Sequence, residues 1–207
     1  MFKLPIFPLD LLVFPGEPVP LHIFEPRYKQ LLTDCAPAAG ERQYSPFGIV
    51  FQGEEGLKDM GCSVVVDEIL HKYPGGELDI MTYGQKRFRC LEIQQEELAY
   101  LHAEVVWIED SEPESAPGLR KEVLELYDDF LRVVEVEDLT LERDTEQLLF
   151  EIAYRVNMEK EFRIDLMQSL KENERLELVL AYLSETVPQI VKVKEFKRRV
   201  RSNGYFV

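Results

Sequence analysis

The stretch Leu4–Tyr28 reads LPIFPLDLLVFPGEPVPLHIFEPRY, and its mixture of apolar residues and prolines decides the fold of the first half of the chain. Proline lacks a backbone donor and is confined to turns, bulges and strand edges. The apolar residues between the prolines suit short, buried strands. The dipeptide Pro15-Gly16 is typical of a turn. The sequence therefore predicts that Leu11–Phe14 and Val19–Phe24 pair as antiparallel neighbours.

A helix is predicted to begin at Glu25-Pro26, directly after this hairpin. Proline suits the first helical turn, where its missing N–H is not required, and a glutamate is favourable at the positive end of the helix dipole. The spacing of the next apolar residues predicts the buried face of this helix, which consists of Tyr28, Leu31, Leu32 and Cys35.

Strand patterns continue from residue 46 to residue 109. The predicted strands are 46–52, 62–73, 78–83, 86–94 and 100–109, with a loop at 53–61, a tight turn at Pro74-Gly75-Gly76 and a bulge or bend at Gly84. Seven or eight short strands with local connections favour a compact, mostly antiparallel barrel, because closing a sheet removes its free edges.

Helical periodicity replaces the strand pattern after the acidic, proline-containing stretch 110–118. Apolar residues then recur at three- and four-residue steps, which predicts helices over 119–134, 145–157 and 162–170. A fourth helix follows, with Asn173 as its cap, and Pro188 should kink or interrupt it. Four helices with single apolar faces indicate a small bundle.

The opening stretch resembles the amino-terminal, substrate-binding domain of the Lon proteases, and stand-alone bacterial versions of that domain in particular. The resemblance rests on Leu4–Leu9, Val13–Gly16 and Pro20–Tyr28, and it extends strongly over residues 4–109 and loosely over 119–187. It implies an α+β fold in which a PUA-like, mostly antiparallel β pseudo-barrel (1–110) precedes an α-helical bundle with a basic end (111–207).

The chain is not expected to be an enzyme. It has no GxxxxGK[ST] loop for a triphosphate, no nucleophile elbow, no HExxH and no GxGxxG, so the catalytic residues of full Lon proteases have no counterparts here. Three widely spaced cysteines, Cys35, Cys62 and Cys90, indicate buried free thiols rather than a disulfide framework or a metal site. No cofactor is predicted.

The charge is distributed unevenly along the chain. The net charge is −15, yet residues 192–201 hold six basic residues and one acidic residue, so the remainder carries −20. A body this acidic repels phosphate backbones, which argues against nucleic-acid binding. The basic end is interpreted as a solvated helix face or as a partner for the chain's own acidic surface, and the alternative is a docking site for an acidic partner. No signal peptide or membrane-spanning run is evident, and a cytoplasmic location is expected.

The favoured function is a non-catalytic protein- or peptide-binding module. The resemblance implies binding of unfolded or client polypeptides and an adaptor role in protein quality control beside a separate protease or chaperone. The predicted peptide-binding residues are Phe14, Leu21, His22, Phe24, Arg27, Tyr28 and Arg87. The competing interpretation places Phe14, Leu21 and Phe24 in the barrel core.

Two other functions remain open from the sequence. PUA-like folds occur in RNA-binding proteins, and the cluster Lys86, Arg87 and Arg89 around Phe88 is the one basic and aromatic group in the barrel sequence. We expect Phe88 in the core and the three cations on one solvated face. An enzyme acting on a small molecule is the third hypothesis, although no nucleophile, metal motif or cofactor motif supports it.

Overall fold

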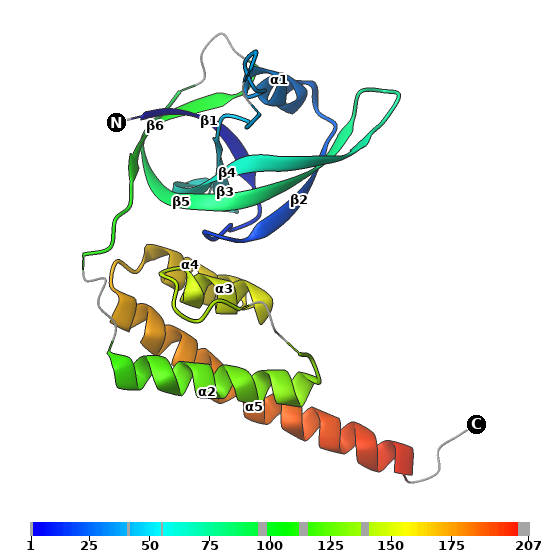
Figure 1. Cartoon of the computed structure of the whole chain (residues 1–207), viewed down its shortest axis with the longest axis vertical. Coiled ribbons are helices and arrows are strands. Elements are labelled where there is room, and N and C mark those ends of the chain that lie inside the picture. Colours follow the sequence, from blue (N-terminus) through cyan, green and yellow to red (C-terminus); the bar gives the residue numbers. More distant parts are fainter. Residues whose placement is uncertain are drawn as a thin grey trace. The chain divides into compact units, whose positions relative to one another are not determined.

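The computed structural model describes residues 2–40, 42–54, 56–94, 99–111, 116–137 and 141–202 of the chain, with side chains up to residue 200. The fold is α+β, as predicted (Figure 1). The chain divides into two compact units, residues 1–109 and residues 110–207. Among the described residues, the first unit contains the strands and one helix, and the second contains four helices.

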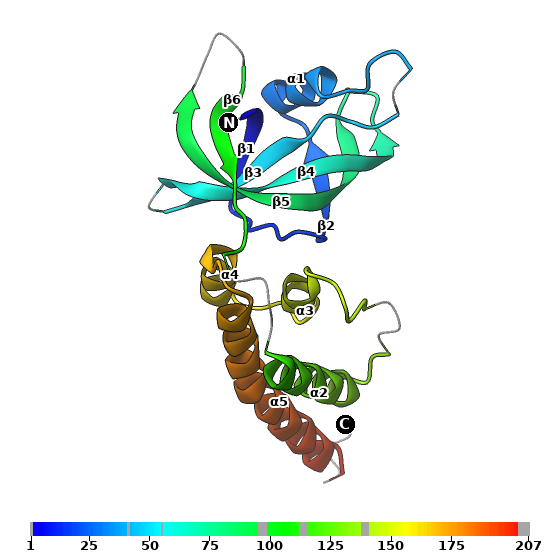
Figure 2. The ribbon, with the colours of Figure 1, turned by 60° about the vertical axis from the view of Figure 1, so that its left-hand side comes forward.

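The first unit is a curved six-stranded sheet that closes on itself (Figures 1 and 2). Its elements are β1 (Phe2–Leu9), β2 (Pro18–Ile23), α1 (Pro26–Asp34), β3 (Phe47–Gly53), β4 (Gly56–Lys72), β5 (Leu78–Gln94) and β6 (Leu101–Trp107). The strand order is β2-β5-β4-β3-β1-β6, and a further pairing of β5 with β6 closes the ring. The β1–β3 pair is parallel, and the other pairs are antiparallel. This is the predicted pseudo-barrel.

The predicted pairing of Leu11–Phe14 with Val19–Phe24 is wrong. Residues 11–14 form no strand, and β2 pairs with the first half of β5 instead. The loop before β2 crosses β5 at Gly84, where the Gly16 N–H donates to the Gly84 carbonyl at 2.9 Å and the Gly84 N–H donates to the Glu17 carbonyl at 3.0 Å. Two backbone groups of this loop are therefore satisfied by β5, while the Glu17 N–H donates to the Phe14 carbonyl at 3.2 Å within the loop.

The strands are fewer and longer than predicted. Gly84 does not divide β5, which runs through 17 residues, and β4 begins at Gly56 within the expected loop. β4 carries register shifts at three places where it pairs with β5. Such bulges let a strand bend without ending it. The turn at Pro74-Gly75-Gly76 is confirmed, with the Gly76 N–H donating to the Tyr73 carbonyl at 2.9 Å and a left-handed φ of 82° at Gly76.

The barrel interior is apolar, and all three thiols of the first unit are buried. Its fully buried side chains include Ile6, Phe14, Ile23, Phe47, Ile49, Ile80 and Phe88. The cysteines are free and buried, as predicted. Burial raises the pKa of the thiols of Cys35 and Cys90 to about 11 and that of Cys62 to about 12, so the thiols stay protonated and unreactive near neutral pH.

Helix α1 forms where the sequence predicts it. Pro26 occupies its first turn, and Tyr28, Leu31 and Leu32 are buried. Cys35, at the carboxyl cap, is buried beside them. The predicted buried face of this helix is therefore confirmed.

The second unit is a four-helix arrangement, as predicted. Its helices are α2 (Pro117–Val134), α3 (Leu148–Arg155), α4 (Lys160–Gln168) and α5 (Glu172–Ser202). Helices α2 and α5 pack along each other (Figures 1 and 2). The 31-residue helix α5 contains Pro188 and is not interrupted by it.

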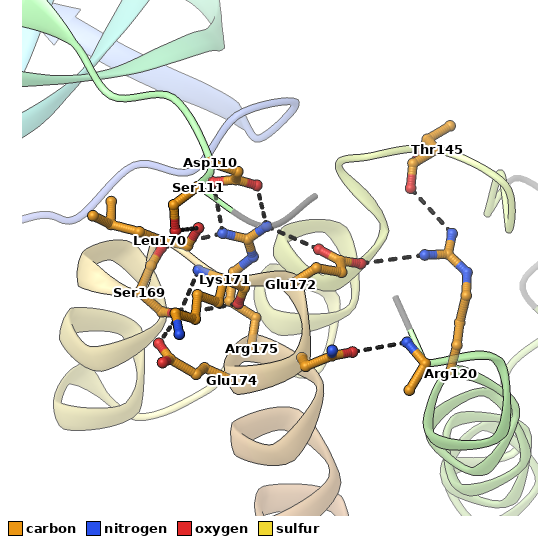
Figure 3. Close-up of polar contacts among 12 residues, drawn as sticks. Asp110, Ser111, Arg120, Thr145, Ser169, Leu170, Lys171, Glu172, Glu174 and Arg175 are labelled. Carbon is orange, nitrogen blue, oxygen red and sulfur yellow. Dashed lines mark hydrogen bonds and ion pairs between the residues drawn. The ribbon is translucent and has the colours of Figure 1, made fainter. Parts of the chain in front are cut away.

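A buried arginine organises the beginning of this unit (Figure 3). The Arg175 side chain is 1% exposed and donates to both carboxylate oxygens of Asp110, to Glu172 at 2.8 Å and to the Ser169 carbonyl at 3.1 Å. Glu172 also accepts from Arg120 of α2 at 3.2 Å. The charges of this network compensate one another, so we assign it a structural role.

Asn173 does not cap α5, contrary to the sequence prediction. It lies inside the first turn of the helix, which begins at Glu172. Its side-chain oxygen accepts a hydrogen bond from the Ala116 N–H at 2.8 Å. Asn173 therefore fixes the residue that precedes α2 and so links the starts of the two helices that pack together.

Candidate functional site

Three neighbouring strands of the barrel present a row of polar and aromatic side chains to solvent. In the register, His22 of β2 lies opposite Asp79 of β5, and Asp79 lies opposite His71 of β4. Directly opposed residues point to the same side of a sheet. Ile23 and Ile80 point into the core, whereas both histidines are exposed. We call this exposed side of β2, β5 and β4 the outer face.

Asp79 accepts two hydrogen bonds at the centre of this row. Its two carboxylate oxygens lie 2.6 Å from His22 Nδ1 and 2.8 Å from the Tyr73 hydroxyl, which donates to it. The hydrogen bonds from His22 and then Tyr73 lower the pKa of Asp79, and the bond to Asp79 raises the pKa of the Tyr73 hydroxyl. The three side chains are thereby held in one orientation at the surface.

Aromatic rings surround this carboxylate. The ring of Phe24 stacks on His22 with a centroid distance of 5.7 Å, Tyr73 meets His22 edge-on at 5.7 Å, and His71 meets Tyr73 at 4.4 Å. Phe24 is nevertheless 59% exposed and Tyr73 is 39% exposed. We call His22, Phe24, His71, Tyr73 and Asp79 the His–aromatic cluster. It offers apolar ring surface to solvent on a rigid support.

A groove of about 680 Å³ continues along the same face. Its lining residues are Arg42 and Gln43 from the loop after α1, Val65, Val66 and Asp67 of β4, and Tyr83 and Gln85 of β5. Asp79, Met81 and Tyr83 alternate with buried residues along β5, so they lie on one side of that strand. The cluster and the groove therefore belong to one continuous surface.

Strand β2 borders the outer face. Among the described strands it pairs with β5 alone, so its other side is an edge. Pro18 and Pro20 of this strand have no N–H to offer to an added strand. An extended ligand on this face would therefore be bound mainly through side chains.

The sequence matches the family described as the ATP-dependent protease La (LON) substrate-binding domain over residues 3–185. The chain belongs to this family. Two solved structures are similar to it in fold. A Lon N-terminal domain protein from Xanthomonas campestris is 24% identical, with a TM-score of 0.66 and coverage of 88% of this chain and 99% of that one. The N-terminal domain of a Mycobacterium avium complex Lon protease is 16% identical, with a TM-score of 0.67 and coverage of 89% and 100%.

The residues predicted to bind peptide in this Lon-family domain do not all reach one surface. His22 and Phe24 lie together on the outer face, and Arg27 is exposed in the first turn of α1, where it pairs with Glu25 at 2.8 Å. Leu21 is half-buried. Phe14, Tyr28 and Arg87 are buried, so their side chains lie in the interior of the unit. The binding role of the set stays a prediction.

The predicted solvated face of cations around Phe88 is wrong. Lys86 and Arg89 are exposed, but Arg87 is only 5% exposed. Neighbouring residues of a strand point to opposite sides, so the three cations could not share one face. Arg89 forms an ion pair with Asp59 at 2.7 Å. Phe88 is fully buried, as predicted.

Sequence reasoning missed His71, Tyr73, Asp79 and Tyr83 as parts of a site. The turn at 74–76 carried a usable signal, because it places Tyr73 opposite Glu77 and hence His71 opposite Asp79. The pairing of β2 with β5 has no such local signal.

The described residues hold neither a cluster of metal-binding side chains nor a membrane-spanning helix. They contain no group of three or more His, Cys, Asp or Glu side chains that could hold a metal ion. Within the same residues, no helix has the length and apolar character required to cross a bilayer.

Proposed function

We propose that this Lon-family domain binds extended segments of unfolded or partly unfolded client polypeptides on the outer face of β2, β5 and β4, in the cytoplasm and without catalysing a reaction. The observation that carries the proposal is the exposed phenylalanine Phe24, which stacks on His22 beside Tyr73. Exposed aromatic rings on a rigid support are typical of protein-binding surfaces.

The chemistry of the face suits polypeptide. The rings of Phe24 and Tyr73 and the half-buried Met81 would contact apolar client side chains. The polar lining of the groove, including Arg42 and Asp67, would form hydrogen bonds with peptide groups. The hydrogen bonds to Asp79 hold His22 and Tyr73 in place before binding, which reduces the entropy lost on association.

An adaptor role extends this proposal. Neither a triphosphate-binding loop nor a serine-hydrolase motif occurs in the sequence. Clients bound on the outer face would therefore be passed to a separate protease or chaperone. RNA binding, the alternative function, has no specific observation in its favour, because Arg87 is buried and Arg89 is paired with Asp59.

The test is binding of a permanently unfolded protein, reduced and carboxymethylated α-lactalbumin, measured by fluorescence anisotropy. We expect Phe24→Ala and Tyr73→Ala each to raise the Kd by about tenfold, the usual effect of truncating an aromatic anchor. Leu91→Ala is the matched control, because Leu91 is 52% exposed on β5 beyond the outer face. Equal affinities for all four proteins, or no binding by the unchanged chain, would contradict the proposal.

A further inference from the structure

Three side chains form a line along β5, the middle strand of the outer face. Asp79, Met81 and Tyr83 alternate with the buried residues Ile80 and Thr82, so they point to the same side of the strand. Side chains two residues apart in a strand are separated by about 6.6 Å. The line therefore presents a carboxylate, a thioether and an aromatic ring at regular steps.

The neighbouring strands give each of these steps different surroundings. Each residue of the line lies opposite one residue of β2 and one residue of β4. These pairs are His22 and His71 for Asp79, Pro20 and Glu68 for Met81, and Pro18 and Val65 for Tyr83. Histidines thus flank the carboxylate, and prolines border the thioether and the ring.

The carboxylate of Asp79 has room for a further hydrogen-bond donor. A carboxylate has about four lone-pair positions, and the bonds from His22 and Tyr73 each use one oxygen. The Asp79 side chain is 32% exposed. Because the Tyr73 hydroxyl bonds to Asp79, the Tyr73 ring lies beside the carboxylate. A lysine or arginine of a ligand could therefore lay its methylene groups against this ring and place its charge at Asp79.

Negative charge prevails on this face. The His–aromatic cluster, the groove and Glu68 together hold three carboxylates and one arginine, namely Asp67, Glu68, Asp79 and Arg42. The chain outside residues 192–201 carries −20 in addition. A bound segment with a positive charge is therefore attracted to the face, whereas an acidic segment or a phosphate backbone is repelled.

We propose that the outer face selects extended client segments in which a lysine or arginine lies two residues from an aliphatic residue and four residues from an aromatic one. This inference rests on the proposed function, since it names the class of client that the same face would bind. In an extended segment, side chains at i, i+2 and i+4 point the same way with the spacing of the line on β5. The cation then meets Asp79, the aliphatic side chain meets Met81, and the aromatic ring meets Tyr83. The match holds for a segment running in either direction.

Peptide titrations, followed by NMR of the isotope-labelled full chain, test this pattern. The probe peptide has lysine, leucine and phenylalanine at alternate positions, with threonine between them. One comparison peptide has glutamine in place of lysine, and another has the lysine moved next to the leucine, where its side chain would point away from the face. We expect the Kd of both comparison peptides to be at least about threefold higher. The amide signals of residues 79–83 should shift on binding. If the glutamine peptide binds as tightly as the lysine peptide and the reversed lysine sequence, the inference is wrong.

Substitution of Asp79 tests the position of the cation. In Asp79→Asn the lysine and glutamine peptides should have equal Kd values, because the charge that distinguishes them is lost. The readout is the ratio of the two Kd values, since a purely structural effect would raise both in the same proportion. Asp59→Asn is the matched control: it makes the same charge change on the other half of β4, where Asp59 pairs with Arg89, and should leave the ratio unchanged. A preference for lysine that persists in Asp79→Asn would overturn the inference.

Different results would contradict this inference and the proposed function. Peptides that shift residues 79–83 but bind with equal Kd values contradict the sequence preference alone. If neither the peptides nor the unfolded protein binds, both proposals are wrong. Light scattering of the unliganded chain covers the remaining case: a dimer that dissociates in Tyr83→Ala would show that a second copy occupies the face, and would also overturn the inference.

Discussion

Gly84 shows how one residue fixes the path of a loop. Its N–H and carbonyl both bond to the loop before β2, and a Cβ built at this position would lie 1.9 Å from the Phe14 carbonyl oxygen. No side chain fits at such a distance from a backbone atom. The sequence marks Gly84 as unusual within a strand but does not indicate which segment approaches it.

We expect Gly84→Ala to lower the free energy of unfolding of the barrel by at least about 2 kcal/mol, because the loop must move away and the two hydrogen bonds weaken. The single tryptophan, Trp107 of β6, reports this unfolding by fluorescence in a urea titration. Gly118→Ala is the control, since a Cβ there meets nothing within 4 Å, and alanine in a helix should leave stability unchanged or raise it by up to about 1 kcal/mol. Similar stabilities for both variants would contradict this account of Gly84.

At the scale of elements, the sequence predicts which segments are strands or helices better than which segments pair. Helical periodicity correctly gives four helices after residue 116, and the buried face of α1 is confirmed. The partner of β2 could not be predicted, because strand pairing depends on the path of the chain between the two strands and not on the composition of either strand. For the same reason the His–aromatic cluster escaped prediction: His22 and Asp79 are 57 residues apart.

Helix α5 gives a second prediction at this scale. Pro188 cannot donate the hydrogen bond expected at its position, and its ring crowds the carbonyl one turn earlier, yet the helix continues. Pro188→Ala should therefore stabilise α5 by about 1–3 kcal/mol. Hydrogen exchange of the amides around residue 188 should slow accordingly. Gln189→Ala, at an exposed neighbouring position, should change exchange little, and equal effects of the two substitutions would argue against a specific cost of proline.

At the scale of the whole molecule, the division into 1–110 and 111–207 remains a prediction, and the chain offers probes that separate its two parts. Trp107 and the three buried cysteines all belong to the first unit, 1–109. The network of Arg175 with Asp110 and Glu172 lies entirely within the second unit, 110–207. A substitution in this network therefore perturbs one unit while the probes report on the other.

Arg175→Ala removes the cation from a buried network and leaves Glu172, which is itself buried, with one partner fewer. Removing one partner of a buried ion pair lowers the free energy of unfolding by about 3–5 kcal/mol. We expect the helical ellipticity to be lost at lower urea while the Trp107 transition and the protection of the thiols stay unchanged. Arg132→Ala, which removes an exposed ion pair with Asp129, is the control and should cost less than about 1 kcal/mol. If the Trp107 transition moves together with the ellipticity, the two parts unfold as one cooperative unit, and the proposed domain division is wrong.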